Sequence, residues 1–402
     1  MRVTHVNVRL AEGGAAQVGL DLHRRLMQAG DKSEFFYGYG PGAGRSPEEA
    51  HIPGARQLGS KIGAMTNFIA HRIAGVEVLP PYGDRAVSFE AAIKHSDVIH
   101  LHATHSYYLP LGWLSKQLRV SQKPIVWTAH DFWLLTGRCA FIENCMRWTV
   151  GCGKCPTQKN YPPAMIDVSA SMRRYKQKTL APLIPMMTIV APTPFVADMF
   201  KTVFPTEQVK VISNGLDFDF EQSVRRINWE TNKQRDNTRV HIIVIAKDLS
   251  DPTKTDHELI NKLLGGGNVI LHTVGQNSPF FNPNVINHGT LTDRQTLAEI
   301  LFSCDYLIFS SKKDTFGLVM AEAMACGVTV LAVDSPAARA VLGGVDSHPL
   351  ADLNSFLERV KSRPSIFNRK MLSEKALRRF SGGVMMTMYK QAYGEAIGRG
   401  RA

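Results

Sequence analysis

The sequence predicts an α/β protein built from two doubly wound parallel sheets, and three observations support this prediction. The chain has 402 residues, which is more than one hydrophobic core usually organises. Short β-branched runs alternate with helical stretches, a pattern typical of a parallel sheet with helices on both faces. The alternation stops once, in a polar stretch around 213–240, and then begins again.

The expected elements follow this alternation. In the first half we expect a helix at Ala15–Ala29 and strands at Arg2–Val8, Glu34–Tyr37, Val98–Leu101, Ile125–Thr128, Thr188–Ala191 and Val209–Ile212. In the second half we expect strands at His241–Ala246, Asn268–Thr273, Val285–Asn287, Tyr306–Phe309 and Val328–Val333. The predicted domains are therefore 1–212 and 241–382, joined by a linker at 213–240. A last helix at 383–397 is suited to packing on either domain, including back on the first.

Composition and motif content argue against a membrane-spanning protein and against a nucleic-acid-binding protein. A hydrophobic content of 44% with 20% charged residues describes an ordinary soluble chain, and no apolar run approaches the roughly 18 residues of a membrane helix. The first residues alternate like a strand and lack the apolar block of a signal peptide, so we expect a cytoplasmic protein. A formal net charge of +12 favours an anionic partner, although a plain excess of surface lysine and arginine also explains it. No nucleic-acid motif is present, so we expect no nucleic-acid partner.

The segment from Ser310 to Gly327 carries the strongest functional signal. It follows the expected strand Tyr306–Phe309, and a helix begins near Thr315-Phe316-Gly317 and ends at Gly327. A strand, a polar loop and a helix N-terminus form an anion site, because free backbone N–H groups point at the ligand. Asp314 and Glu322 place a carboxylate at each end. The segment therefore suits both halves of a sugar diphosphate.

Two lysines follow the first strand of the second half. Lys247 comes directly after it and Lys254 lies in the next loop, where both suit charge-assisted hydrogen bonds to a diphosphate. A solvated loop lysine is the alternative for each. In the first half, Gly13 and Gly14 end the first strand and open a helix, so the backbone can approach a ligand closely. An ordinary tight turn is the alternative there, and the glycine-rich stretch 40–44 lacks the following helix of a dinucleotide loop.

Histidines follow two other strands. His130 stands at a strand end beside Asp131, which favours a functional role over a purely structural one. His100, His102 and His105 follow the preceding strand. Metal binding, hydrogen bonding to an acceptor and plain loop chemistry all remain open for these histidines. We predict that His102 and His105, together with Gly13, contact the acceptor.

Four of the six cysteines fall close together in the cysteine-rich loop 139–155. They are Cys139, Cys145, Cys152 and Cys155, and the last pair forms a C-x2-C knuckle. In a cytosolic chain this clustering favours zinc over disulfides, and four thiolates make a closed structural site. Cys304 and Cys326 are expected to be buried as small apolar residues.

Two further motifs have two interpretations each. Asp217-Phe218-Asp219 imitates an acidic triplet that holds a divalent ion, but it lies beside the linker and away from the phosphate loops. The basic stretch 172–178 precedes the apolar Leu180–Ile184 and suits either anionic lipid or a solvated helix face.

Taken together, these motifs resemble those of the retaining GT-B glycosyltransferases of family 4, over essentially the whole chain. The likeness is strongest to the colanic-acid-type exopolysaccharide transferases. It is carried by Asn7–Ala16, Trp127–Asp131, Thr136–Phe141 and Gly151–Pro156. The resemblance implies two Rossmann-like domains that face a central cleft.

The resemblance also implies roles for residues that match the family's motifs. Glu322 matches the acid that holds the nucleotide ribose. Asp314 matches the acid that touches the donor sugar, where the family normally has Glu. Lys254 matches the phosphate lysine, and Lys247 stands where many members have Arg. Backbone contacts to the diphosphate are implied for Thr315, Phe316, Gly317 and Leu318. Gly14 matches a glycine near the donor phosphate, and His130 matches a histidine that bonds the donor sugar.

The implied function is transfer of a hexose from a nucleotide sugar to a lipid-linked saccharide, with retention, in bacterial cell-surface polysaccharide biosynthesis. UDP-galactose is the expected donor and a GDP-sugar the alternative. We expect no cofactor at the reacting centre, a structural zinc at the cysteines, and peripheral association with the cytoplasmic face of an anionic inner membrane. The alternatives are a GT-B epimerase or phosphorylase and a non-catalytic scaffold of a polysaccharide assembly complex.

Overall fold

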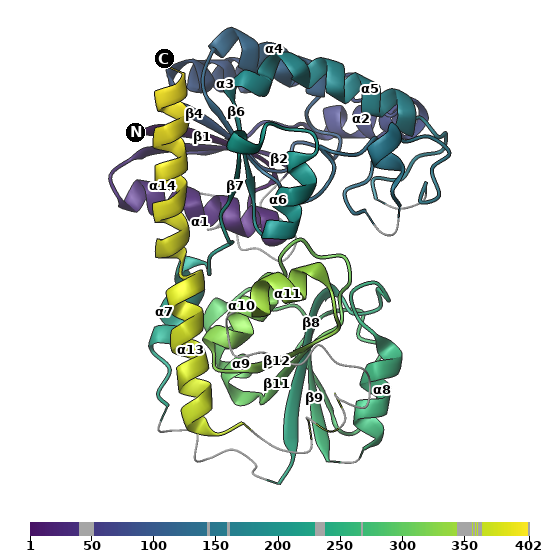
Figure 1. The fold of residues 1–402 in the computed structure, drawn as a ribbon, viewed down its shortest axis with the longest axis vertical. Helices are drawn as coiled ribbons and strands as arrows, with labels where there is room; N and C mark the ends of the chain where they lie inside the picture. Colours follow the sequence, from purple (N-terminus) through teal and green to yellow (C-terminus); the bar gives the residue numbers. More distant parts are fainter. Residues whose placement is uncertain are drawn as a thin grey trace. The chain divides into compact units, whose positions relative to one another are not determined.

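The computed structural model describes residues 1–39, 52–142, 145–158, 161–229, 238–266, 268–343, 356, 358, 360 and 364–400. The glycine-rich stretch 40–44 lies outside these residues. The chain divides into two compact units (Figure 1). Unit 1 comprises Met1–Ile212 and Met386–Ala402, and unit 2 comprises Ser213–Met385. Each unit contains one sheet whose described strands all pair in parallel, so the predicted fold class is confirmed.

The sheet of unit 1 has the strand order β3-β2-β1-β4-β5-β6-β7. Its strands are β1 (Arg2–Arg9), β2 (Lys32–Tyr39), β3 (Ala55–Gln57), β4 (Val98–Leu101), β5 (Ile125–Thr128), β6 (Met187–Ala191) and β7 (Val209–Val211). Its helices are α1 (Gly14–Gln28), α2 (Lys61–Ala74), α3 (Asp84–His95), α4 (Leu111–Ser121), α5 (Ser169–Leu180) and α6 (Pro194–Lys201). Short 3-10 turns lie at η2 (Arg147–Val150), η3 (Ala181–Met186) and η4 (Thr206–Gln208).

The two faces of this sheet differ in chemistry because successive side chains of a strand point to opposite faces. On one face Ile99 and Leu101 of β4 join an apolar cluster with side chains of α3 and α4. On the other face His100 of β4 is fully buried and bonds Tyr393 of helix α14 (Gly382–Arg399). The first face is an ordinary core, whereas the second buries polar side chains that must be paired.

The sheet of unit 2 has the order β10-β9-β8-β11-β12. Its strands are β8 (Val240–Asp248), β9 (Val269–Gln276), β10 (Val285–Asn287), β11 (Tyr306–Phe309) and β12 (Thr329–Ala332). Its helices are α7 (Phe218–Arg225), α8 (His257–Gly265), α9 (Arg294–Ser303), α10 (Leu318–Ala325), α11 (Pro336–Leu342) and α13 (Ile366–Phe380). Side chains of α9, α10 and α13 form one apolar cluster with the sheet, and α8 forms another with alternate strand residues.

The segment expected to be a linker is partly structured. Within 213–240 the structure places helix α7, and Phe220 and Val224 of this helix lie in the core of unit 2. The polar composition misled the prediction, because the apolar residues recur at helical spacing between the charged ones. Helix α14, yellow in Figure 1, begins in unit 2, and its residues from Met386 belong to unit 1. No described helix is both long and apolar enough to cross a bilayer.

Candidate functional site

Unit 2 has a topological switch point between β8 and β11. From β8 the chain proceeds outward to β9 and β10, and then returns to β11 and β12 on the other side. In sheets of this kind ligands bind beyond the carboxyl ends of the strands at the switch point. Lys254 lies in the loop that follows β8, and Asp314 lies in the loop that follows β11. The Lys254 Nζ atom donates to Asp314 Oδ1 at 2.8 Å, and both side chains are partly exposed.

A turn holds the Lys254 backbone in place. The backbone N–H groups of Thr253 and Lys254 both donate to Asp251, to a carboxylate oxygen at 2.8 Å and to the carbonyl oxygen at 3.0 Å respectively. From the neighbouring loop, Ser310 Oγ donates to the Lys254 carbonyl at 3.3 Å and accepts from the Asp256 N–H at 2.9 Å. The two loops that carry Lys254 and Asp314 are therefore tied together by backbone and side-chain hydrogen bonds.

Helix α10 begins beside this pair. Its N-cap is Gly317, whose φ of 80° lies in the left-handed region. A Cβ atom there would lie 2.8 Å from Met320 Cε and 2.9 Å from Phe309 Cζ, so both conformation and space favour glycine. No side chain caps the helix, and an anion at this end would meet its first N–H groups. Thr315 and Phe316 are buried, whereas Gly317 and Leu318 are partly exposed.

Glu322 is buried on α10 and pairs with Arg294, the first residue of α9. The same guanidinium pairs with Asp217 at 2.6 Å. Burial by itself lowers the pKa of Arg294, but Glu322 and Asp217 outweigh it and raise that pKa. Asp217 also accepts from the Phe220 N–H at 2.9 Å as the N-cap of α7. Asp217 is therefore a cap and an ion-pair partner, and no described metal cluster includes it or Asp219.

Lys247 was expected just past a strand end. The structure extends β8 to Asp248, so Lys247 is an exposed residue within the strand, next to a register irregularity between Ile245 and Asp248. It lies at the same carboxyl end of β8 as the Lys254 loop.

Unit 1 has its own switch point, between β1 and β4. The loop after β1 carries Gly13 and Gly14, which are both exposed, and Gly13 is the N-cap of α1 with a φ of 90°. A Cβ atom on Gly13 would meet nothing within 4 Å, so its backbone conformation, and not its space, requires glycine. The first N–H groups of α1 therefore lie at the position where doubly wound sheets bind ligands.

Three histidines form a hydrogen-bonded chain behind this switch point. His130 Nε2 lies 3.0 Å from His102 Nδ1, and His102 Nε2 lies 3.2 Å from His5 Nδ1. Burial lowers the pKa of His130 to about 4, and burial together with neighbouring histidines holds the pKa of His102 and His5 well below the usual range. All three are therefore neutral at pH 7. His102 is buried and orients His130, and contact of His102 with an acceptor stays a prediction.

His105 is also buried and supports another side chain. Its Nε2 atom lies 2.7 Å from Asp131 Oδ2, and its Nδ1 atom lies 2.7 Å from Ser106 Oγ. Burial raises the pKa of Asp131, but His105, the Trp133 N–H and His130 together outweigh burial and lower that pKa, so this carboxyl group stays ionised. His105 therefore orients Asp131, the more exposed of the two side chains, and contact of His105 with an acceptor stays a prediction.

The buried histidines also lie close enough together to be considered as a metal site. His5, His100 and His102 place one nitrogen each within 4.8 Å of the others. His100 uses both ring nitrogens, toward Tyr393 and Thr128, and His102 uses both toward its histidine neighbours. A metal ion would have to break these bonds, so the cluster is a hydrogen-bonded network.

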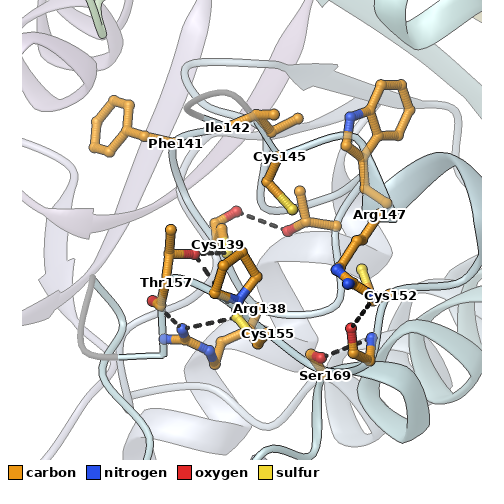
Figure 2. A pocket seen from close by; sticks show the side chains of 14 residues that line it. Arg138, Cys139, Phe141, Ile142, Cys145, Arg147, Cys152, Cys155, Thr157 and Ser169 are labelled. Carbon is orange, nitrogen blue, oxygen red and sulfur yellow. Dashed lines mark hydrogen bonds between the residues drawn. The ribbon is translucent and has the colours of Figure 1, made fainter.

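The four cysteines of the loop 139–155 line one pocket (Figure 2). All four are free thiols. The Gly137 N–H donates to Cys152 Sγ at 3.2 Å, and Arg138 Nη2 lies 3.5 Å from Cys155 Sγ. The pocket lies near the strand-end segment, because the Phe132 N–H donates to the Ala140 carbonyl at 2.9 Å.

The basic stretch 172–178 lies on α5 and does not form a lipid-facing surface with its apolar neighbours. Leu180 and Leu183 are buried, as are Arg173 and Lys176. The Lys176 ammonium donates to the Trp133 carbonyl and lies 4.0 Å from the centre of the Trp133 ring. Of the two interpretations, the solvated helix face applies only to the exposed residues Arg174, Gln177 and Lys178.

Sequence reasoning missed Arg294, and it treated Asp131 only as a neighbour of His130. Arg294 follows a helix N-cap and not a strand end, so no local pattern marks it. Its partners Asp217 and Glu322 are distant in sequence and meet it only through the packing of α7, α9 and α10.

Comparisons with known proteins give two family matches. Residues 12–220 match the model described as Glycosyltransferase Family 4, and residues 254–362 match Glycosyl transferases group 1. The chain is 36% identical over 351 residues to WcaC of Escherichia coli (strain K12), a glycosyl transferase named for colanic acid biosynthesis. The match covers 85% of each chain.

Solved structures with the same fold include Anabaena HepE in complex with UDP and glucose. Its TM-score is 0.64 at 15% identity, covering 98% of this chain and 100% of that chain. WaaG, a glycosyltransferase involved in lipopolysaccharide biosynthesis, matches with a TM-score of 0.58 at 12% identity, covering 97% and 98%. These likenesses identify the two-domain architecture as GT-B.

Proposed function

Because this chain belongs to glycosyltransferase family 4, we propose that it transfers a hexose from a nucleotide sugar to a lipid-linked saccharide with retention of anomeric configuration. The observation that carries the proposal is the Lys254–Asp314 pair at the switch point of unit 2. It places a cation, a carboxylate and a helix N-terminus together, which suits a sugar diphosphate.

The donor half of the reaction belongs to unit 2. A leaving nucleoside diphosphate gains negative charge as the glycosidic bond breaks, and preorganised donors stabilise such charge. Lys254 and the first N–H groups of α10, which follow the N-cap Gly317, supply these donors. Lys247, at the carboxyl end of β8, is proposed as a further donor. Asp314 accepts from Lys254 at 2.8 Å, so it holds the ammonium in place and can accept from sugar hydroxyls.

The identity of the donor is proposed from a structural likeness. HepE, which has the same fold, was solved with UDP and with UDP-glucose. We therefore propose a UDP-sugar, with UDP-galactose first and a GDP-sugar as the alternative. Glu322 is proposed as the ribose contact. Its Oε1 atom accepts from Arg294, which fixes the carboxylate in one orientation.

In unit 1, we propose that His130 and Asp131 hydrogen-bond the sugars. His130 is neutral and oriented by His102, so it can hydrogen-bond the donor sugar without adding charge. Asp131 is ionised and oriented by His105, so it can accept from an acceptor hydroxyl. Gly13 and Gly14 leave the backbone at the start of α1 open to a ligand.

A lipid-linked acceptor requires contact with a membrane, and helix α2 provides a suitable surface. Ile62, Met65, Ile69 and Ile73 follow one helix face, and each is more than half exposed. This face carries no carboxylate, because α2 contains no acidic residue. Exposed apolar residues on a helix with basic side chains suit an anionic lipid surface. WcaC is named for colanic acid biosynthesis, and we place this chain in a related exopolysaccharide pathway at the cytoplasmic face of the inner membrane.

A thermal-shift screen followed by product analysis tests the proposal. One nucleotide sugar at about 100 times its dissociation constant stabilises the chain by about 2.7 kcal/mol, and we expect a UDP-sugar to do so. Radiolabelled sugar should then move to a lipid-linked saccharide, and NMR of the product should show the donor's anomeric configuration.

Other products would overturn the proposal. An altered free sugar nucleotide without an acceptor would identify an epimerase, and a requirement for phosphate would identify a phosphorylase. A chain that binds no nucleoside diphosphate in isothermal titration would be a scaffold. Activity is expected to need no added divalent ion, since the proposed cations at the leaving group are side chains.

A further inference from the structure

The four cysteines Cys139, Cys145, Cys152 and Cys155 are gathered in one loop region of unit 1, beside the buried Trp148. Their side chains line the same pocket (Figure 2), and all are free thiols. Thr157 Oγ1 lies 3.6 Å from Cys139 Sγ and 3.7 Å from Cys155 Sγ. These sulfurs therefore approach one another from both ends of the loop.

The backbone of the C-x2-C knuckle is held in an uncommon conformation. Cys152, Gly153 and Lys154 have φ values of 66°, 91° and 47°, and left-handed backbone at residues other than glycine persists only where the surroundings impose it. The Gly153 N–H donates to Ser169 Oγ at 3.0 Å, and the Cys155 N–H donates to Asp167 at 2.7 Å. These bonds hold the knuckle so that both of its sulfurs point into the pocket.

Buried positive charge surrounds the same sulfurs. Arg138, Arg173 and Lys176 are each at most 5% exposed. Among the described residues, Arg173 Nε has no hydrogen-bond partner, and Lys176 donates to the Trp133 carbonyl. Cys152 interacts electrostatically with both of these side chains. Buried cations are costly unless nearby charge or hydrogen bonds compensate them. Asp131 favours the charged form of Lys176, and negative charge at Cys152, which interacts with both cations, would add to this compensation.

We propose that Cys139, Cys145, Cys152 and Cys155 bind one structural zinc ion. Four thiolates around Zn²⁺ carry two net negative charges, and these charges add to the compensation of Arg173 and Lys176. On binding, the four thiols release their protons to solvent and each sulfur forms one bond to the metal. Zinc accepts four thiolates in a closed tetrahedral site at about 2.3 Å.

Binding requires the loop to close. In a tetrahedral site the sulfurs lie about 3.8 Å apart, whereas among the described residues no three of these sulfurs lie within 4.8 Å of one another. The ion would therefore order the backbone around Cys139, Cys145, Cys152 and Cys155. Because the Phe132 N–H donates to Ala140, and Thr136 Oγ1 donates to the Cys139 carbonyl at 2.7 Å, that ordering extends to the segment that carries Asp131.

Metal analysis of the full chain, purified without chelator under reducing conditions, tests this inference. We expect about one zinc per chain by plasma mass spectrometry, released when an organomercurial titrates the thiols. Cys152→Ser and Cys155→Ser should each lose most of the metal, whereas the control Cys304→Ala, which removes a buried thiol of unit 2, should keep it.

Two measurements on the wild-type chain keep the test decisive if the serine variants fail to fold. Cobalt(II) in place of zinc should give an intense thiolate charge-transfer band and tetrahedral d–d bands. Metal removal should increase hydrogen exchange within 139–155. Zinc-free protein without cobalt bands would overturn the proposal, as would disulfides among these four residues in peptide mass spectra. Since the readout is metal content, the result does not depend on the transfer reaction.

Discussion

The switch points of the two units use opposite electrostatic strategies. In unit 2, partly exposed or buried ion pairs surround the candidate site, with Lys254 on Asp314 and Arg294 on Glu322. In unit 1, the equivalent position is supported by a chain of neutral histidines that ends at His130. Fixed charge suits a diphosphate, whereas neutral hydrogen-bonding groups suit sugar hydroxyls. The two units therefore offer different recognition chemistry, one for charged groups and one for neutral hydroxyls.

The largest expected effect is on catalysis and comes from the charged unit. Lys254→Ala should lower the turnover number at least about tenfold, because it removes a donor to the leaving diphosphate. The control is Lys262→Ala, which removes an exposed lysine of α8 that pairs with Glu258. Turnover is measured with labelled donor, and circular dichroism should be unchanged. Full activity in Lys254→Ala would show that charge at this switch point does not drive the reaction.

The second effect concerns stability of the same unit. Arg294→Ala leaves Glu322 and Asp217 without their shared cation, and breaking a buried pair costs about 3 kcal/mol or more. Hydrogen exchange in α7, α9 and α10 should therefore accelerate. The control Arg339→Ala breaks only an exposed pair with Asp334 and should leave exchange unchanged. Equal exchange in both variants would contradict a stabilising role for the ion pairs of Arg294 with Glu322 and Asp217.

A third test uses pH to separate the units. Burial lowers the pKa of His23 and His130 to about 4, so the unfolded state binds more protons than the folded state between pH 6.5 and 4. The resulting stability is present above pH 6.5 and is lost as the pH falls through about 4. Each such histidine contributes up to about 3 kcal/mol, at about 1.4 kcal/mol per pKa unit. Unit 1 should therefore unfold first on acidification.

Urea unfolding at pH 7.5 and pH 5, followed by tryptophan fluorescence, measures this loss. Unit 1 contains four of the five tryptophans, Trp113, Trp127, Trp133 and Trp148. His23→Gln should flatten the pH dependence, whereas His95→Gln, at an exposed position, should not. If hydrogen exchange at pH 5 rises first in unit 2, the neutral-histidine description of unit 1 is wrong.

The smallest effect is expected at the cap of α10. Gly317→Ala places a Cβ atom in left-handed backbone, which costs about 1–2 kcal/mol, and crowds Met320 and Phe309. We expect a lower melting temperature and weaker nucleotide binding by titration calorimetry. Gly265→Ala is the matched control, because its Cβ would meet nothing within 4 Å. Tighter or equal nucleotide binding in Gly317→Ala would show that the N-terminus of α10 does not bind the diphosphate.

Much of the fold followed from local pattern. Alternation of β-branched runs with helical stretches predicted the parallel sheets, because fully buried parallel strands read as short apolar runs. Strand β3 was missed, since Ala55–Gln57 has neither length nor apolar character. Helix α7 was missed inside a polar segment. Both errors occurred where tertiary packing outweighs local composition.

The candidate site divides in the same way. Lys254, Asp314 and His130 were predictable because each follows a strand, and the carboxyl ends of parallel strands share one edge of the sheet. Their supporting partners were not. His102 and His105 hydrogen-bond His130 and Asp131, and those pairings depend on which strands are neighbours in the sheet.

The sequence by itself determined the two sheets, the strand-end positions of Lys254 and Asp314, and the clustering of four cysteines. These features are local, so spacing and residue type are sufficient to read them. Only the tertiary structure decided that Arg294 joins Glu322 to Asp217 and that His5 lies behind His102. Such contacts join residues from different elements, and they depend on strand order and helix packing, which local pattern does not encode.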